Sequence, residues 1–96
     1  MNKPITGIGV MEALVMASVW KHAEKQESVT VPEVFKDTHE AHRRAYTSIM
    51  TVMTRLAKKG LLEVDKSYIP YRYKPTMSKE EFRTTLHEDV DKILGE

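Results

Sequence analysis

"YTSIMTVMTRLAKKG", residues 46–60, is the stretch that decides the fold of this chain. Its apolar side chains recur at the spacing i, i+3, i+4 and i+7, which is typical of one face of an α-helix. This face consists of Ile49, Val52, Met53 and Leu56. Gly60 is expected to end the helix, because glycine readily adopts the left-handed conformation found after many helices. The opposite face carries threonines where a solvated surface would more often carry Glu, Lys or Gln, so we predict that it has a binding role.

Two more helices are predicted before this stretch. Residues 10–25, "VMEALVMASVWKHAEK", lack glycine and proline and are apolar around most of the helix circumference, so this helix should be largely buried. A short helix is predicted in "VTVPEVFKDT", where Thr30 and Glu33 have the spacing of a capping box. Val29 and Val34 are placed to form a hydrophobic staple at its start.

A hairpin and a last helix are predicted after this stretch. "LLEVDK" (61–66) and "YRYKP" (71–75) alternate apolar and polar side chains, as half-buried strands do, and "SYIP" links them. "SKEEFRTTLHEDVDKIL" (78–94) opens with a capping box, Ser78 to Glu81, and is amphipathic.

Three helices followed by a hairpin is the element order of a winged helix-turn-helix, in which the helix before the hairpin enters the major groove of DNA. We therefore predict a mainly α protein with a small β-hairpin: three helices, a two-stranded wing and a C-terminal fourth helix. The expected division is a winged-helix DNA-binding domain in residues 1–77 and a C-terminal helix, a candidate dimerisation element, in residues 78–96.

Composition restricts the class of protein. A chain of 96 residues with 41% hydrophobic content suits one domain, and the lack of cysteine excludes disulfides, thiolate zinc sites and a cysteine nucleophile. No apolar run approaches the roughly 20 residues that span a bilayer, and residues 1–9 do not form a secretory signal, so we expect a cytoplasmic protein without a membrane partner. The carboxylate pairs of the last helix have no accompanying nucleophile or phosphate loop, so we expect neither enzymatic activity nor a cofactor.

Positive charge is concentrated in residues 43–74. This segment holds eight Lys and Arg against two acidic residues, a net charge of +6, while the whole chain carries +1 and the remainder therefore −5. Such asymmetry favours a polyanionic partner. Arg43, Arg44 and Lys59 flank the helix at 46–60 and are expected to hold phosphates. Its threonines can hydrogen-bond base edges or contact thymine methyl groups.

The chain resembles the penicillinase repressor family (BlaI/MecI/CopY type) over most of residues 8–86. "IGVMEALVMASVW" (8–20) is similar to the family's first helix, and "AYTSIMTVMTRLAKKGLL" (45–62) is similar to its recognition helix. "YRYKPTMSKEEF" (71–82) is similar to its second wing strand and following helix. The resemblance implies a transcriptional repressor that binds a dyad operator as a dimer. It also implies that four side chains face the groove: Thr47, Ser48, Thr51 and Arg55.

The sequence departs from this family at two places. Family wings usually carry glycine and then arginine at the tip, where this chain has "KSYIPY", so Lys66, Arg72 or Tyr68 would have to supply the contact. The family also continues into further helices that dimerise and hold a regulatory cleavage site, so protease-triggered induction is not predicted from the present residues. The complete set of predicted contacts to double-stranded DNA is Arg43, Arg44, Tyr46, Thr47, Ser48, Thr51, Arg55, Lys59, Lys66, Arg72 and Lys74.

The interface for assembly is left open by the sequence. A dyad operator needs two recognition helices about 34 Å apart, so we expect a homodimer, weak in solution. The last helix or the unusually apolar first helix could provide its interface, or the last helix could instead fold back onto its own domain. The predicted dimerisation stripe is Phe82, Leu86, Val90, Ile93 and Leu94.

An alternative function is a winged-helix interaction module that docks on a protein partner through the C-terminal helix. His39 and His42 lie near two acidic residues and could bind zinc, but structural zinc sites need four ligands. A solvated turn is the simpler interpretation, and no metal site is predicted.

Overall fold

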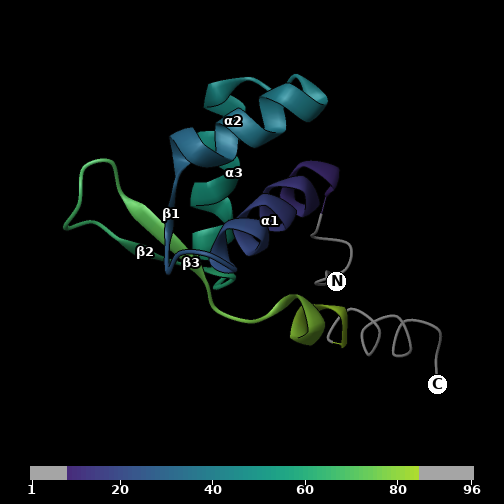
Figure 1. Ribbon diagram of the computed structural model, residues 1–96, viewed down its shortest axis with the longest axis vertical. Helices are drawn as coiled ribbons and strands as arrows, with labels where there is room; N and C mark the ends of the chain where they lie inside the picture. Colours follow the sequence, from purple (N-terminus) through teal and green to yellow (C-terminus); the bar gives the residue numbers. More distant parts are fainter. Residues whose placement is uncertain (1–8, 85–96) are drawn as a thin grey trace.

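The computed structural model describes residues 9–84 of the chain. Residues 79–84 begin a further helix, and the rest of the predicted C-terminal helix lies outside the described residues. Figure 1 shows the three helices gathered together, with the β2–β3 hairpin projecting on the side of α3 away from α1. The predicted winged helix-turn-helix architecture is confirmed. The elements are, in chain order, α1 (Val10–Ala23), β1 (Val29–Thr30), α2 (Val31–His42), α3 (Tyr46–Lys58), β2 (Leu62–Asp65) and β3 (Arg72–Pro75).

The core is built around α3. Its predicted inward face, Ile49, Val52, Met53 and Leu56, is at most 4% exposed, which confirms the helical period. Apolar side chains from α1, α2 and the sheet close the core around this face. They are Val15, Met16, Val19, Val29, Val31, Val34, Leu62 and Tyr73.

The start and end of α2 set the direction in which the chain enters α3. The backbone N–H of Thr30 donates to Glu33 Oε1 (2.8 Å), and the N–H of Glu33 donates to Thr30 Oγ1 (3.4 Å), so the predicted capping box is confirmed. α2 ends at His42, and the cap residue that follows, Arg43, has a φ of 56° in the left-handed region. This conformation stops the helix, and α3 begins three residues later at Tyr46.

The sheet has one strand more than the predicted hairpin. Its order is β1-β3-β2, and β1 pairs antiparallel with β3 in the register Val29↔Tyr73 and Thr30↔Arg72. Two residues are too few to show the alternation by which strands are predicted. Thr30 was expected as a helix cap, and it serves both as this cap and as the last residue of β1.

The first turn of the C-terminal helix lies against α1. The predicted capping box is confirmed, since the Ser78 N–H donates to Glu81 Oε1 (2.7 Å) and the Glu81 N–H to Ser78 Oγ (3.0 Å). Trp20 on α1 donates its indole N–H to the Met77 carbonyl (3.0 Å), and its ring centroid lies 5.3 Å from that of Phe82. Phe82, the first residue of the predicted dimerisation stripe, therefore contacts its own domain. The other four, Leu86, Val90, Ile93 and Leu94, lie outside the described residues.

Candidate nucleic-acid interface

The outward face of α3 is exposed along its whole length. Thr47, Thr51 and Thr54 are all exposed on the side opposite the core, and Met50 between them has an exposed fraction of 45%. The Thr54 hydroxyl donates to the Met50 carbonyl (3.0 Å), a common use of threonine within a helix. This face therefore offers hydroxyl groups, methyl groups and a thioether to a partner.

Two shallow hollows cover this face. The first, which we name the N-terminal hollow, contains six of the predicted contacts, together with Met11, Ala45 and Val52; the six are Arg43, Arg44, Thr47, Ser48, Thr51 and Arg55. The second, the C-terminal hollow, is lined by Met50, Thr51, Thr54, Arg55 and Lys58. Thr51 and Arg55 belong to both, so they form the centre of the surface.

The N-terminus of α3 is suited to an anion. Among the described residues no side chain caps it, because the N-cap position is occupied by Ala45. The first amide groups of a helix carry partial positive charge and lack intrahelical acceptors. Arg43 and Arg44 line the hollow beside them, and the Arg44 Nε is buried without a hydrogen-bond partner within residues 9–84. Amides and guanidinium groups together form a surface of the kind that holds phosphate.

Tyr46 connects the first turn of α3 to α2. Its ring lies edge-on to that of Phe35, with centroids 5.3 Å apart and planes at 71°. Its side chain is nevertheless 40% exposed. Tyr46 is therefore positioned by α2 and is still accessible in the first turn of α3, although it does not line the N-terminal hollow.

Lys59 lies at the other end of α3 and has an acidic partner. Its Nζ lies 2.9 Å from Oε2 and 3.1 Å from Oε1 of Glu12, which is buried in the first turn of α1. Burial raises the pKa of Glu12, but hydrogen bonds from Lys59 and the Gly9 amide, with the charges of Lys59 and Arg55, bring that pKa below its usual value. Lys59 was predicted to contact phosphate, and the structure shows that it also forms an ion pair with Glu12 of its own domain.

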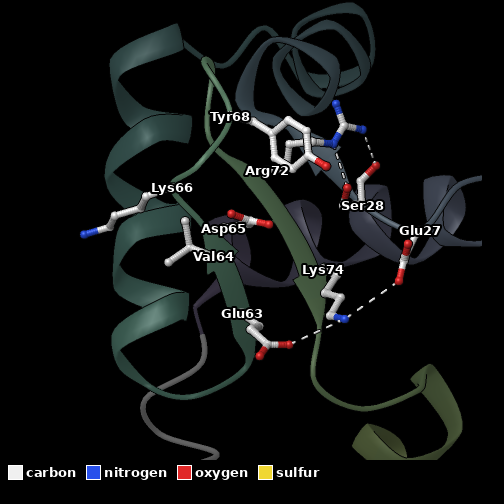
Figure 2. A pocket seen from close by; sticks show the side chains of 9 residues that line it. All are labelled: Glu27, Ser28, Glu63, Val64, Asp65, Lys66, Tyr68, Arg72 and Lys74. Atoms are coloured by element: carbon white, nitrogen blue, oxygen red, sulfur yellow. Dashed lines mark hydrogen bonds and ion pairs between the residues drawn. The ribbon is translucent and has the colours of Figure 1, made fainter.

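Arg72 and Lys74 lie on a different face from the α3 hollows. In the register of β2 and β3, Glu63 lies opposite Lys74 and Asp65 opposite Arg72. Figure 2 shows Lys74 between Glu63 (3.8 Å) and Glu27 (4.0 Å). This face of the sheet therefore combines cations with carboxylates, which weakens its attraction for a polyanion.

Other contacts hold Arg72, while Lys66 points elsewhere. Arg72 donates from Nε to the Ser28 hydroxyl (2.6 Å) and from its second guanidinium nitrogen to the Ser28 carbonyl (2.8 Å). In Figure 2, Lys66 points away from this group, toward the side on which α3 is drawn. Of the three predicted contacts in the hairpin, Lys66 is the one directed toward the α3 side.

Two residues of this region were not predicted from the sequence. Met11 enters the N-terminal hollow from α1, and Glu12 holds Lys59. Both lie more than 30 residues from α3 along the chain. Helical periodicity contains no signal for contacts between separate helices, so the sequence offered nothing that pointed to either.

A second polar cluster joins α1 to α2 away from this surface. Asp37 accepts hydrogen bonds from the Ser18 hydroxyl (2.8 Å) and Lys21 Nζ (3.3 Å), and its Oδ2 lies 2.9 Å from His22 Nε2. Burial raises the pKa of Asp37, but these three neighbours bring it below its usual value. These interactions hold α2 against α1.

Residues 9–84 contain neither a candidate metal site nor a candidate membrane-spanning helix. There, no group of three or more His, Cys, Asp and Glu side chains is arranged to hold a metal ion. His39 Nδ1 lies 3.4 Å from the Arg44 carbonyl oxygen, in the turn before α3. No helix in the same range is long and apolar enough to cross a membrane.

The fold and the exposed α3 face define a winged helix-turn-helix domain. The family model described as "Penicillinase repressor" matches residues 8–95, and the chain belongs to this family. It is similar to two proteins named "Transcriptional regulator BlaI", from the CDC 1551 / Oshkosh and the ATCC 25618 / H37Rv strains of Mycobacterium tuberculosis. Each is 34% identical over 86 residues, which cover 90% of this chain and 60% of the relative. The chain therefore matches less than two thirds of these relatives' length.

Proposed function

We propose that this protein is a transcriptional repressor that binds DNA in a sequence-specific manner and inserts α3, about residues 45–59, into the major groove. Membership of the penicillinase repressor family and similarity to two transcriptional regulators support this proposal. The observation that carries it is the exposed α3 face, whose two hollows share Thr51 and Arg55.

The residues of this face divide into two roles. Thr47, Ser48 and Thr51 are short and exposed, so they read base edges and thymine methyl groups. Arg43 and Arg44, with the uncapped amides of α3, hold a backbone phosphate and fix the register of the helix in the groove. Arg55 is long enough to contact either a guanine or a phosphate.

Repression of a dyad operator also requires two copies of the domain. The two recognition helices must lie about 34 Å apart, one helical turn of DNA, and a single winged helix supplies one of them. We propose that the protein binds as a homodimer, with the C-terminal helix as the joining element. Occupancy of a promoter by such a dimer would exclude RNA polymerase and so repress transcription.

Selection of binding sites from random duplexes with the full 96-residue chain tests this proposal. A consensus with dyad symmetry is expected after enrichment. The matched control is the triple variant Thr47→Ala, Ser48→Ala, Thr51→Ala, whose core residues are unchanged and which should enrich no consensus. If the wild-type chain enriches no sequence, or if the triple variant enriches the same one, the proposed readout by α3 is wrong.

A further inference from the structure

The outward face of α3 carries a methionine among its threonines. Met50 has an exposed fraction of 45%, and it lines the C-terminal hollow together with Thr51, Thr54, Arg55 and Lys58. Its side chain is therefore open to small molecules at the surface proposed to meet DNA. The 96 residues contain no cysteine, so methionine is their only sulfur-containing side chain that oxidants can attack.

The other methionines that the structure describes are better protected than Met50. Met16 and Met53 lie in the core, with exposed fractions of 1% and 0%. Met11 and Met77 are partly buried. A buried sulfur atom is reached by an oxidant only when the surrounding structure opens, whereas an exposed one is reached directly. Met50 should therefore react before the other described methionines.

Oxidation changes what Met50 offers to DNA. A peroxide transfers one oxygen atom to the thioether sulfur: the O–O bond breaks, an S–O bond forms and water leaves. The sulfur loses two electrons and the peroxide gains them. The thioether is apolar and can contact the methyl group of thymine in the major groove. The sulfoxide is polar, so it would have to give up its hydration to occupy the same place.

We propose that Met50 is a redox-sensitive modification site, whose oxidation to the sulfoxide by peroxide weakens sequence-specific DNA binding and so relieves repression. This inference rests on the proposed function. The fold is kept, because the Met50 side chain lies outside the core and its carbonyl, which accepts from the Thr54 hydroxyl (3.0 Å), is not altered. Arg43 and Arg44 line the other hollow, so phosphate binding there is also kept. Methionine sulfoxide reductases restore the thioether, which makes the change reversible.

Treatment of the full 96-residue chain with hydrogen peroxide, which is then removed, tests this proposal. Peptide mass spectrometry measures the sulfoxide at each methionine, and fluorescence anisotropy measures affinity for the consensus that the untreated chain selects. As sulfoxide accumulates at Met50, this affinity should fall on the order of tenfold, the size of one lost base-pair contact. Affinity for a scrambled duplex should stay the same. The two methionine sulfoxide reductases, one for each sulfoxide epimer, should restore binding to the consensus.

Two leucine variants locate the effect. Met50→Leu keeps an apolar side chain of similar volume, so it should bind the consensus and no longer respond to peroxide. Met77→Leu makes the same change at a partly buried methionine outside both hollows and should respond as the wild-type chain does. If Met50→Leu binds poorly before treatment, the loss and recovery in the wild-type chain, compared with the sulfoxide at each methionine, decide instead.

The outcomes separate this inference from the proposed function. Full affinity for the consensus with Met50 oxidised would overturn the redox site and leave the function of α3 intact. An equal loss of affinity in Met50→Leu and the wild-type chain would overturn it as well, because the responsible residue would lie elsewhere. An untreated chain that selects no DNA would instead overturn the function proposed for α3, and the redox site with it.

Discussion

Lys59 at the end of α3 is paired with Glu12 in the first turn of α1, and the two charged groups lie 2.9 Å apart. The Glu12 side chain is 5% exposed and the Lys59 side chain 33% exposed. The Gly9 amide also donates to Glu12, at 3.0 Å, so the same carboxylate caps the start of α1. A nearly buried anion therefore fixes the end of the proposed recognition helix against the first helix.

Removal of the Lys59 charge should destabilise the protein. Lys59→Met leaves the Glu12 carboxylate buried without its paired lysine. This should lower the free energy of unfolding by about 3 kcal/mol. Lys58→Met removes an exposed lysine one residue earlier and should change the free energy of unfolding by less than about 0.5 kcal/mol. Urea denaturation followed by circular dichroism measures both. Equal stabilities of the two variants would show that the ion pair contributes nothing.

Stability should fall in acid because of three carboxyl groups. Burial raises the pKa of Glu12, Glu33 and Asp37, but hydrogen bonds and nearby positive charge outweigh it and lower each pKa below its ordinary value. Their contribution is then complete above the pKa of the unfolded chain and is lost as pH falls through the lower folded pKa. The urea midpoint should be constant from about pH 7 to 5.5 and should decline between about pH 5 and 3. Glu12→Gln should make this decline shallower, and an unchanged decline would exclude Glu12 as a cause.

The helical part of the fold could be predicted from the sequence because its signals are local. Ile49 and Leu56 follow the period of one helix, and Thr30 with Glu33 marks the start of another. The strand at Val29 could not be predicted, because two residues show no alternation.

The candidate site was predictable where it lies on a single helix. The exposure of Thr51 and Arg55 follows from the same period that buries the core of α3. The partners of Lys59 and Lys74 were not predictable, since they come from other elements and depend on how these pack. The net charge of residues 43–74 therefore overstated the positive charge available to a polyanion, because Lys59 and Lys74 each lie beside a carboxylate.

Readout by α3 can be tested at two threonines. Thr51→Ala should weaken binding to the selected consensus by on the order of 1–3 kcal/mol and barely alter non-specific affinity. Thr54→Ala is the matched control on the same face, because the Thr54 hydroxyl already donates to the Met50 carbonyl; its loss should be smaller. Fluorescence anisotropy with consensus and scrambled duplexes gives both affinities. Equal losses on the two duplexes for Thr51→Ala would exclude it from readout.

The basic residues should differ in their effect on salt dependence. Each phosphate contact removed lowers the slope of log affinity against log salt by roughly 0.9. Arg43→Ala and Arg44→Ala should each show this change because both line the hollow at the start of α3. Lys74→Ala should show much less, since Lys74 lies beside Glu27 and Glu63. A salt-independent affinity of the wild-type chain would mean that this positive surface does not bind phosphate.

Assembly through the C-terminal helix should be weak in solution and cooperative on DNA. The predicted C-terminal helix contains a modest apolar stripe in its sequence, and Phe82 at its start packs on Trp20 of its own domain. A small interface and a monomer–dimer equilibrium near micromolar concentration are therefore expected. Two adjacent half-sites raise the effective concentration of the second copy and favour pairing. Leu86→Asp should abolish cooperative filling and keep binding to one half-site, whereas Thr84→Asp, an exposed position in the same helix, should keep both. Sedimentation equilibrium and half-site titration measure these effects. A tight dimer that survives Leu86→Asp would place the interface elsewhere, and a strict monomer that fills half-sites independently would rule out the dyad arrangement.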